Sequence, residues 1–170
     1  MRAAMIGAPR RALVWSLLLG LLAAPLAAQG ALARKVTASL ARVYGADATA
    51  DSLPIGAATV LRIRRAGVVI GFAQVRDVMG KEAPITCLIA TDSTLVLRDV
   101  DVLVYREAYG GEVAYEPWRK QFRGRTPRDT LTVGRTVRGI SGATISVNAV
   151  TGLIRATLAD FARWRGEGRL

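Results

Sequence analysis

The chain has 170 residues, a length that suits one domain, two at most. It carries 24 Lys and Arg residues against 13 Asp and Glu residues, a formal net charge of +11, and 51% of its residues are hydrophobic. The absence of histidine excludes Ser-His-Asp and Cys-His catalysis and histidine-ligated metals. The single cysteine, Cys87, excludes an intramolecular disulfide and a cysteine-ligated zinc or iron–sulfur site, so redox chemistry would need an organic cofactor.

The N-terminus resembles an export signal. Residues 1–11 hold three arginines and no acidic residue, and the 22 residues that follow are uncharged. Their most apolar part is shorter than the ~20 residues of a spanning helix, and Pro25 ends it. We therefore predict that residues 1–28 are a signal peptide cleaved after Ala28, with an uncleaved membrane anchor as the alternative, and that residues 29–170 form a single domain outside the cytoplasm.

The predicted domain begins with a short helix. Val36, Leu40 and Val43 recur at i, i+4 and i+7, which predicts an amphipathic helix over Arg34–Tyr44 that ends at Gly45. The next segment, up to residue 56, is rich in Ala, Asp, Ser, Pro and Gly and is predicted to be a loop.

Four strands follow, joined by short turns. They are predicted at Thr59–Arg65, Val68–Val75, Ile85–Thr91 and Val96–Tyr105. Strands that follow one another without helices between them pair antiparallel. The sequence therefore predicts an α+β fold, in which a mainly antiparallel twisted sheet packs with a short N-terminal helix and a long C-terminal helix.

Single residues within these strands allow finer predictions. Gly71 indicates a bulge or a close approach of other atoms, and Cys87 lies in a nearly all-apolar strand and is expected in the core. In the last strand Val100, Val102 and Val104 are predicted to share one face. Asp99 and Asp101 are predicted to lie on the other face, which is exposed to solvent. The alternative is that these paired carboxylates serve acid–base chemistry or bind a metal.

The segment Trp118–Arg128 holds five basic residues with two aromatic ones among them. Such a patch is compatible with nucleic-acid binding. We favour a short helix instead, with Trp118 and Phe122 facing the core at i, i+4 and the basic residues facing outward. Export also removes nucleic acid as a routine partner.

A long amphipathic helix is predicted near the C-terminus, ended by Gly166. A run of small and hydroxylated residues, 139–146, precedes it, and Ser146 is predicted as its N-cap. A helix N-terminus offers unpaired backbone N–H groups to an anion, and Arg138 could add a charged contact. The apolar positions of this helix are Val147, Val150, Ile154, Leu158 and Phe161.

The segment Ser141-Gly142-Ala143-Thr144, followed by Ile145-Ser146 and a helix, resembles the flavinylation motif of the FMN-binding domain family. That family includes the G subunit of the Rnf complex and the C subunit of the sodium-pumping NADH:quinone oxidoreductase. Its motif threonine carries FMN through a phosphoester bond, made outside the cytoplasm by a flavin transferase that uses FAD. The resemblance implies that FMN is joined to Thr144 and is contacted by Ser141, Gly142, Ala143, Ile145, Ser146, Glu107 and Gly110. It places the phosphate at the backbone around Ser141 to Ser146 and the flavin ring in a cleft near Glu107 to Gly111.

The chain departs from the family pattern in two places. The family's glutamate–glycine turn usually has the form Glu-Thr-Pro-Gly-x-Gly, so Glu107 and Gly110 match while Ala108, Tyr109 and Glu112 differ. The family also places an aspartate three residues before the first Ser or Thr of its motif, where this chain has Arg138.

The resemblance implies an exported electron-transfer flavoprotein, loaded by a flavin transferase and exchanging electrons with a membrane-bound or extracytoplasmic redox partner. It is more naturally a redox carrier or an oxidoreductase subunit than a stand-alone enzyme. The alternative is a non-redox module that binds a phosphate-bearing ligand or an acidic partner reversibly. A nucleic-acid-binding domain ranks last.

Overall fold

The computed structural model describes residues 26–170, so the predicted export signal lies largely outside the described residues. From Leu26 onward, no helix is long and apolar enough to cross a membrane. The elements in chain order are α1 (Leu26–Tyr44), β1 (Thr49–Ile55), β2 (Ala58–Arg65), β3 (Val68–Met79), β4 (Pro84–Asp92), β5 (Leu97–Val104), the 3-10 turn η1 (Gly111–Ala114), α2 (Glu116–Arg119), the 3-10 turn η2 (Lys120–Phe122) and α3 (Thr144–Gly166).

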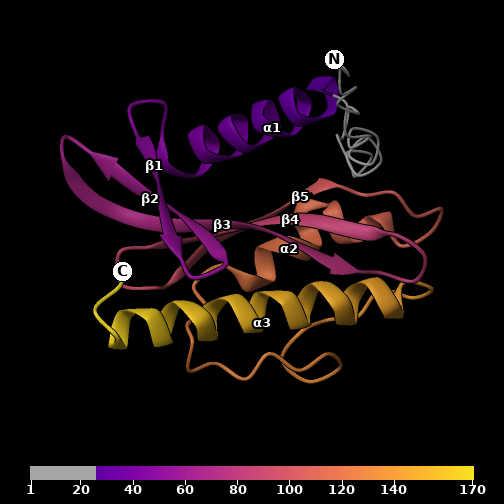
Figure 1. Ribbon diagram of the computed structural model, residues 1–170. Coiled ribbons are helices and arrows are strands. Elements are labelled where there is room, and N and C mark those ends of the chain that lie inside the picture. The colour runs from indigo at the N-terminus through magenta and orange to yellow at the C-terminus, as the bar shows by residue number, and fades with distance from the viewer. Residues whose placement is uncertain (1–25) are drawn as a thin grey trace, which may run out of the picture.

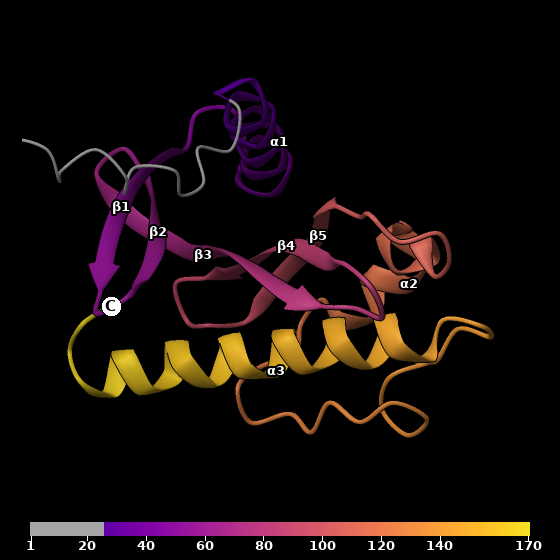
Figure 2. The ribbon, with the colours of Figure 1, turned by 45° about the vertical axis from the view of Figure 1, so that its right-hand side comes forward.

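The five strands form one antiparallel sheet in the order β1-β2-β3-β4-β5. Short turns account for this simple order; between β2 and β3, for example, Ala66 and Gly67 both have positive φ, as the right-handed twist of a hairpin favours. Helix α1 lies over one face of the sheet and α3 over the other (Figures 1 and 2). The predicted α+β class is confirmed.

Helix α1 is longer than predicted. It begins at Leu26 instead of Arg34, because the uncharged, alanine-rich residues before Arg34 continue the helix and Leu32 packs against the sheet. Its predicted end is confirmed: Gly45 has φ 94° and donates its N–H to the carbonyl oxygen of Ala41 at 2.9 Å.

The loop predicted up to residue 56 is wrong, since most of it forms strand β1. Its sequence shows little apolar alternation, and Pro54 would weaken a central strand. At the edge of the sheet a proline is tolerated, and the pairing with β2 supplies the order that the local sequence does not. Asp51 stands opposite Arg62 in this pairing and accepts hydrogen bonds from its guanidinium at 2.9 and 2.5 Å.

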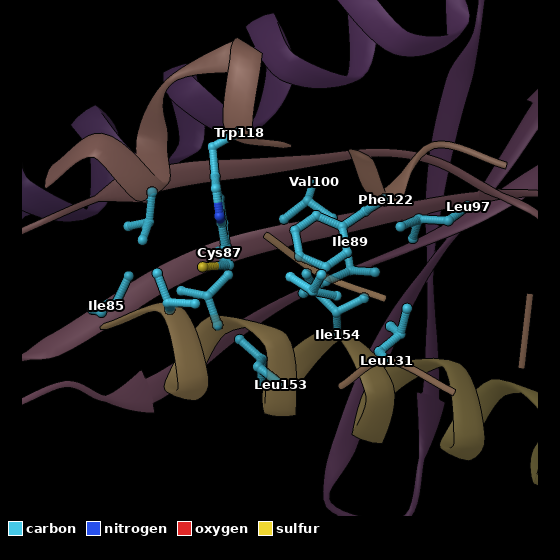
Figure 3. Packing of buried hydrophobic residues seen from close by; sticks show 14 of the residues in the cluster. Ile85, Cys87, Ile89, Leu97, Val100, Trp118, Phe122, Leu131, Leu153 and Ile154 are labelled. Atoms are coloured by element: carbon cyan, nitrogen blue, oxygen red, sulfur yellow. The ribbon is translucent and has the colours of Figure 1, made fainter. Parts of the chain in front are cut away.

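Both faces of β4 are buried, which explains its nearly continuous apolar sequence. Ile85, Cys87 and Ile89 pack with α3, while Leu88 and Ala90 belong to the cluster under α1. Figure 3 shows this first cluster, with Cys87 among side chains that converge from the sheet, α2 and α3. Burial raises the pKa of the Cys87 thiol to about 12, so the residue is a core side chain, as predicted.

Gly71 combines the two roles predicted for it. The pairing register of β2 with β3 shifts between Ile63 and Arg64, next to the Gly71 partner, so a bulge is present. A Cβ on Gly71 would stand 2.3 Å from the carbonyl oxygen of Thr91 and 2.6 Å from the ring of Tyr44. The Tyr44 phenol uses this space to donate to that carbonyl at 2.7 Å, which ties the end of α1 to the sheet.

The solvated face predicted for β5 is wrong for Asp99, whose side chain is only 4% exposed. Arg42 from α1, Arg119 from α2 and Arg123 surround its carboxylate, and Arg42 also bonds Asp101 at 2.7 Å. Strand alternation places both acids on one face, but the elements that cover this face lie far away in the sequence. Val104 also departs from the predicted face, since a register shift in the β4–β5 pairing places it in the cluster under α1.

The segment after β5 forms the predicted helical turn. Trp118 is 7% exposed and Phe122 is fully buried, with their rings edge to face at 5.1 Å between centroids. Arg119 contradicts the prediction that the basic residues face outward, because it is 8% exposed and bonds the carbonyl oxygens of Ala114 and Val100. In α3 all five predicted apolar positions are buried, and the helix ends at Gly166 as predicted.

Candidate functional site

A cavity of about 400 Å³ opens where three segments meet: the β3–β4 turn, the loop after β5, and the first turn of α3. Figure 1 shows these segments at the same end of the sheet. The lining residues are Lys81, Glu82, Glu107, Ala108, Tyr109, Gly142, Ala143, Thr144, Ile145 and Ser146.

The first turn of α3 presents free backbone donors. Ala143 is the N-cap and has no side-chain cap, and the helical hydrogen bonds begin with the N–H of Val147, which donates to Ala143 at 2.9 Å. Within residues 26–170, no acceptor is recorded for the N–H groups of residues 144–146. Gly142 has φ 78°, a conformation that other residues adopt at a cost, and it turns the chain into the helix. These donors, with the positive end of the helix dipole, suit an anion such as a phosphate.

Ser146 is not the N-cap that its sequence position predicted. It is the third residue of the helix, and it is only 3% exposed. Its hydroxyl lies 2.9 Å from the phenol oxygen of Tyr105 and 3.3 Å from Oε2 of Glu107. The side chain therefore points back into the protein and links α3 to the loop after β5.

Glu107 joins all three segments that form the cavity. Its carboxylate accepts the backbone N–H of Glu82 at 2.7 Å and of Ala83 at 3.3 Å, both in the β3–β4 turn, besides its contact with Ser146. The hydrogen bond from the Glu82 N–H is the largest cause that lowers the pKa of Glu107 below its ordinary value. Glu107 is thus an ionised carboxylate at the cavity and also a structural link.

Thr144 lines the cavity and is exposed. Its hydroxyl has no hydrogen-bond partner recorded in the described part of the chain, so the oxygen is free to react or to bind. Ile145, next to it, is 50% exposed and lines the same cavity.

Two residues of the predicted site, Gly110 and Ser141, do not line the cavity. A Cβ on Gly110 would lie 2.7 Å from the Tyr105 hydroxyl and 2.8 Å from the Ser146 hydroxyl, so its small size lets the loop pack under α3. Ser141 is exposed in the turn just before the lining residues.

Arg138 lies outside the cavity. Its backbone N–H donates to Oε1 of Gln121 at 2.7 Å, and its carbonyl oxygen accepts the indole N–H of Trp118 at 2.8 Å. Its guanidinium lies 3.5 Å from the carbonyl oxygen of Pro117 and does not line the cavity, contrary to the expected charged contact with an anion there. Trp118 and Gln121 thus hold the chain just before the motif turn.

Two lining residues, Lys81 and Glu82, were not predicted from the sequence, and two others, Ala108 and Tyr109, lie within the segment from Glu107 to Gly111 where the resemblance places the flavin ring. The first two lie in a hairpin turn that the β3–β4 register brings to the cavity, and no local pattern marks them. Of these residues, Lys81 supplies the one ammonium group in the lining, 67% exposed and 3.3 Å from the carboxylate of Glu82.

Comparison with known proteins agrees with this location. Residues 80–159 match the family model of the FMN-binding domain. The match begins in the β3–β4 turn and ends within α3, so it includes every residue that lines the cavity. Among curated proteins, none matches the chain.

The cavity fits the chemical parts of FMN. Its volume lies within the roughly 300–1,000 Å³ range of small-molecule sites. The free N–H groups of residues 144–146 suit the phosphate, and the exposed apolar side chains of Tyr109 and Ile145 suit a planar ring system.

Proposed function

Residues 80–159 belong to the FMN-binding domain family, and from this premise we propose that the protein is an exported electron carrier with FMN joined covalently to Thr144. A flavin transferase that uses FAD attaches the cofactor outside the cytoplasm. The carrier then exchanges electrons with a membrane-bound or extracytoplasmic redox partner. Residues 1–28 direct export, as a cleaved signal or as an anchor.

One observation supports the covalent assignment. Thr144 is the first residue of α3, within the segment that matches the family, and its exposed hydroxyl has no hydrogen-bond partner in the described residues. In the attachment step the Thr144 oxygen forms a bond to the flavin phosphorus of FAD. The pyrophosphate bond of FAD breaks, and AMP is the leaving group. The proton of the Thr144 hydroxyl goes to the phosphate of AMP. The protein gains FMN less one water.

The chain's own residues hold the group in this proposal. The N–H groups of residues 144–146 bind the phosphate, and Lys81, which also lines the cavity, balances negative charge. Glu107 keeps the β3–β4 turn, its own loop and α3 together, so that the cavity has a fixed shape. FMN supplies the electron-transfer chemistry when bound, and the protein supplies orientation and electrostatics.

The proposal also explains why the chain has few reactive side chains of its own. It has no histidine, and Cys87 is buried with a raised pKa. A covalent bond prevents loss of the cofactor in a compartment without a pool of free flavin. A carrier of this kind needs a tether and a cavity more than it needs an acid or a nucleophile.

The test is the intact mass of the protein co-produced with a flavin transferase in the export compartment, with in-gel flavin fluorescence after denaturation. We expect the mass of FMN less one water, and fluorescence that survives denaturation. Thr144→Ala is expected to lose both and to stay folded, whereas Thr130→Ala, an exposed threonine in the preceding loop, keeps both. Covalent flavin on folded Thr144→Ala would overturn the assignment.

Arg138 replaces the aspartate of the family pattern, so loading by a generic transferase is tested separately with Arg138→Asp. Because the Arg138 guanidinium does not line the cavity, we expect this variant to load as fast as the wild type, or faster. Unmodified wild type with a loaded Arg138→Asp variant would identify Arg138 as a barrier to that transferase. If neither protein is modified while FMN binds reversibly, the covalent proposal is wrong.

A further inference from the structure

Exposed apolar side chains are unevenly distributed over the described surface. The large hydrophobic residues with high exposure are Val68, Met79, Tyr109, Tyr115 and Ile145. Two of them, Tyr109 at 83% and Ile145 at 50%, line the same cavity from different segments of the chain. Tyr109 is the most exposed of the five. Because burial of apolar surface is favourable, two exposed apolar side chains at the wall of one cavity offer a surface that a ligand can cover.

The main chain at Tyr109 is held while its ring is free. Its carbonyl oxygen accepts a hydrogen bond from the phenol of Tyr105, and that phenol also lies 2.9 Å from the hydroxyl of Ser146 in α3. No hydrogen bond or aromatic contact of the Tyr109 side chain is recorded within residues 26–170. The anchored backbone therefore fixes the position of this ring at the wall of the cavity.

We propose that the side chain of Tyr109 packs against the isoalloxazine ring of the flavin, with Ile145 as a second apolar contact. The inference rests on the proposed function and deepens it, since it assigns the residues that contact the ring. The rest of the lining is charged, hydroxylated or small, so these two side chains supply its large apolar surface. The family's turn usually has proline at the position of Tyr109, so this contact is a property of this chain.

A phenol in contact with a flavin quenches the flavin's fluorescence, because it donates an electron to the excited ring and recovers it without emission. The test uses the FMN-loaded protein, with flavin content fixed by intact mass. The steady-state intensity and lifetime of flavin fluorescence are compared, folded and denatured, for wild type, Tyr109→Leu and Tyr115→Leu. Tyr115 is the matched control, because it is 63% exposed in the same loop region and does not line the cavity.

We expect the folded Tyr109→Leu protein to fluoresce several-fold more strongly than wild type, with a longer lifetime, and Tyr115→Leu to equal wild type. All three should match after denaturation, which controls for flavin content. Equal fluorescence of folded Tyr109→Leu and wild type, both carrying FMN by mass, overturns the inference and leaves the proposed function standing. A rise in Tyr115→Leu equal to that in Tyr109→Leu also overturns it. Absence of FMN from the wild type overturns the proposed function, and this inference with it.

Discussion

The two ends of β5 each hold a carboxylate that ties distant elements together, but the partners differ in kind. At the start of the strand Asp99 is enclosed by the guanidinium groups of Arg42, Arg119 and Arg123. After its end Glu107 accepts neutral backbone N–H groups and a hydroxyl. The negative charge of Asp99 is balanced by these three arginines, and its side chain is buried. Glu107 lies beside a cavity that is also lined by the first turn of α3, whose N–H groups have no acceptor within residues 26–170.

This difference separates structure from function in the molecule. The charges around Asp99 are paired with one another and join α1 and α2 to the sheet, and they also line a second cavity of about 480 Å³. At the other end the hydrogen bonds of Glu107 and Ser146 hold the walls of the cavity, while the donors of α3 and the hydroxyl of Thr144 remain free. The comparison predicts large effects on stability from the first network and local effects from the second.

The largest effect is expected from Asp99→Asn. Loss of this buried charge removes the common partner of three arginines. Because Arg42 and Arg123 are about 40% exposed and all three arginines keep a second carboxylate, we expect a loss of about 1–3 kcal/mol of unfolding free energy. Urea denaturation measures the loss. Asp51→Asn, which affects an exposed ion pair at the sheet edge, is the control and should change stability little. If both variants are equally stable, the Asp99 network does not fix the helices.

A smaller effect is expected from Trp118→Phe. The substitution keeps an aromatic ring against Phe122 but removes the indole N–H that bonds the carbonyl oxygen of Arg138 at 2.8 Å, a loss of about 1 kcal/mol. Because this bond holds the chain just before the motif, amide hydrogen exchange should accelerate at residues 139–142. Trp164→Phe, at the other end of α3, should leave exchange at those residues unchanged. Unchanged exchange in Trp118→Phe would mean that the indole does not hold the motif turn.

The smallest effect is a pH dependence confined to the cavity. The pKa of Glu107 is lowered in the folded protein, so its stabilising contribution is complete above the ordinary value of 4.5 and is lost as the pH falls through the folded-state pKa below that value. The amide signals of Glu82, Ala83 and Ser146 should shift together below pH 4.5 in an NMR titration. Glu107→Gln should remove this common transition. A transition that persists in that variant would show that another group causes it.

Predictions from the sequence succeeded where the structure follows from a local pattern. The strands from β2 to β5 and the buried face of α3 follow from local spacing, and the structure agrees with them. The motif at the N-terminus of α3 was identified by its resemblance to a known family, and the family match includes it. Strand β1 was missed, because its order comes from pairing with β2 and not from its own pattern. The N-cap role predicted for Ser146 was wrong, and so was the placement of the Arg138 guanidinium at the anion site. The fold brings Tyr105 and Glu107 next to Ser146. It brings Trp118 and Gln121 next to the backbone of Arg138.

The sequence by itself determined the fold class, the order of the elements and the position of the motif from Ser141 to Thr144, because periodicity, turn residues and short motifs are local properties. Only the tertiary structure decided that Asp99 is covered, that Ser146 points inward, and that Tyr109, Lys81 and Thr144 line one cavity. These facts depend on strand register and on how helices cover the sheet. Contacts between residues far apart in the chain set both, and no short stretch of sequence records them.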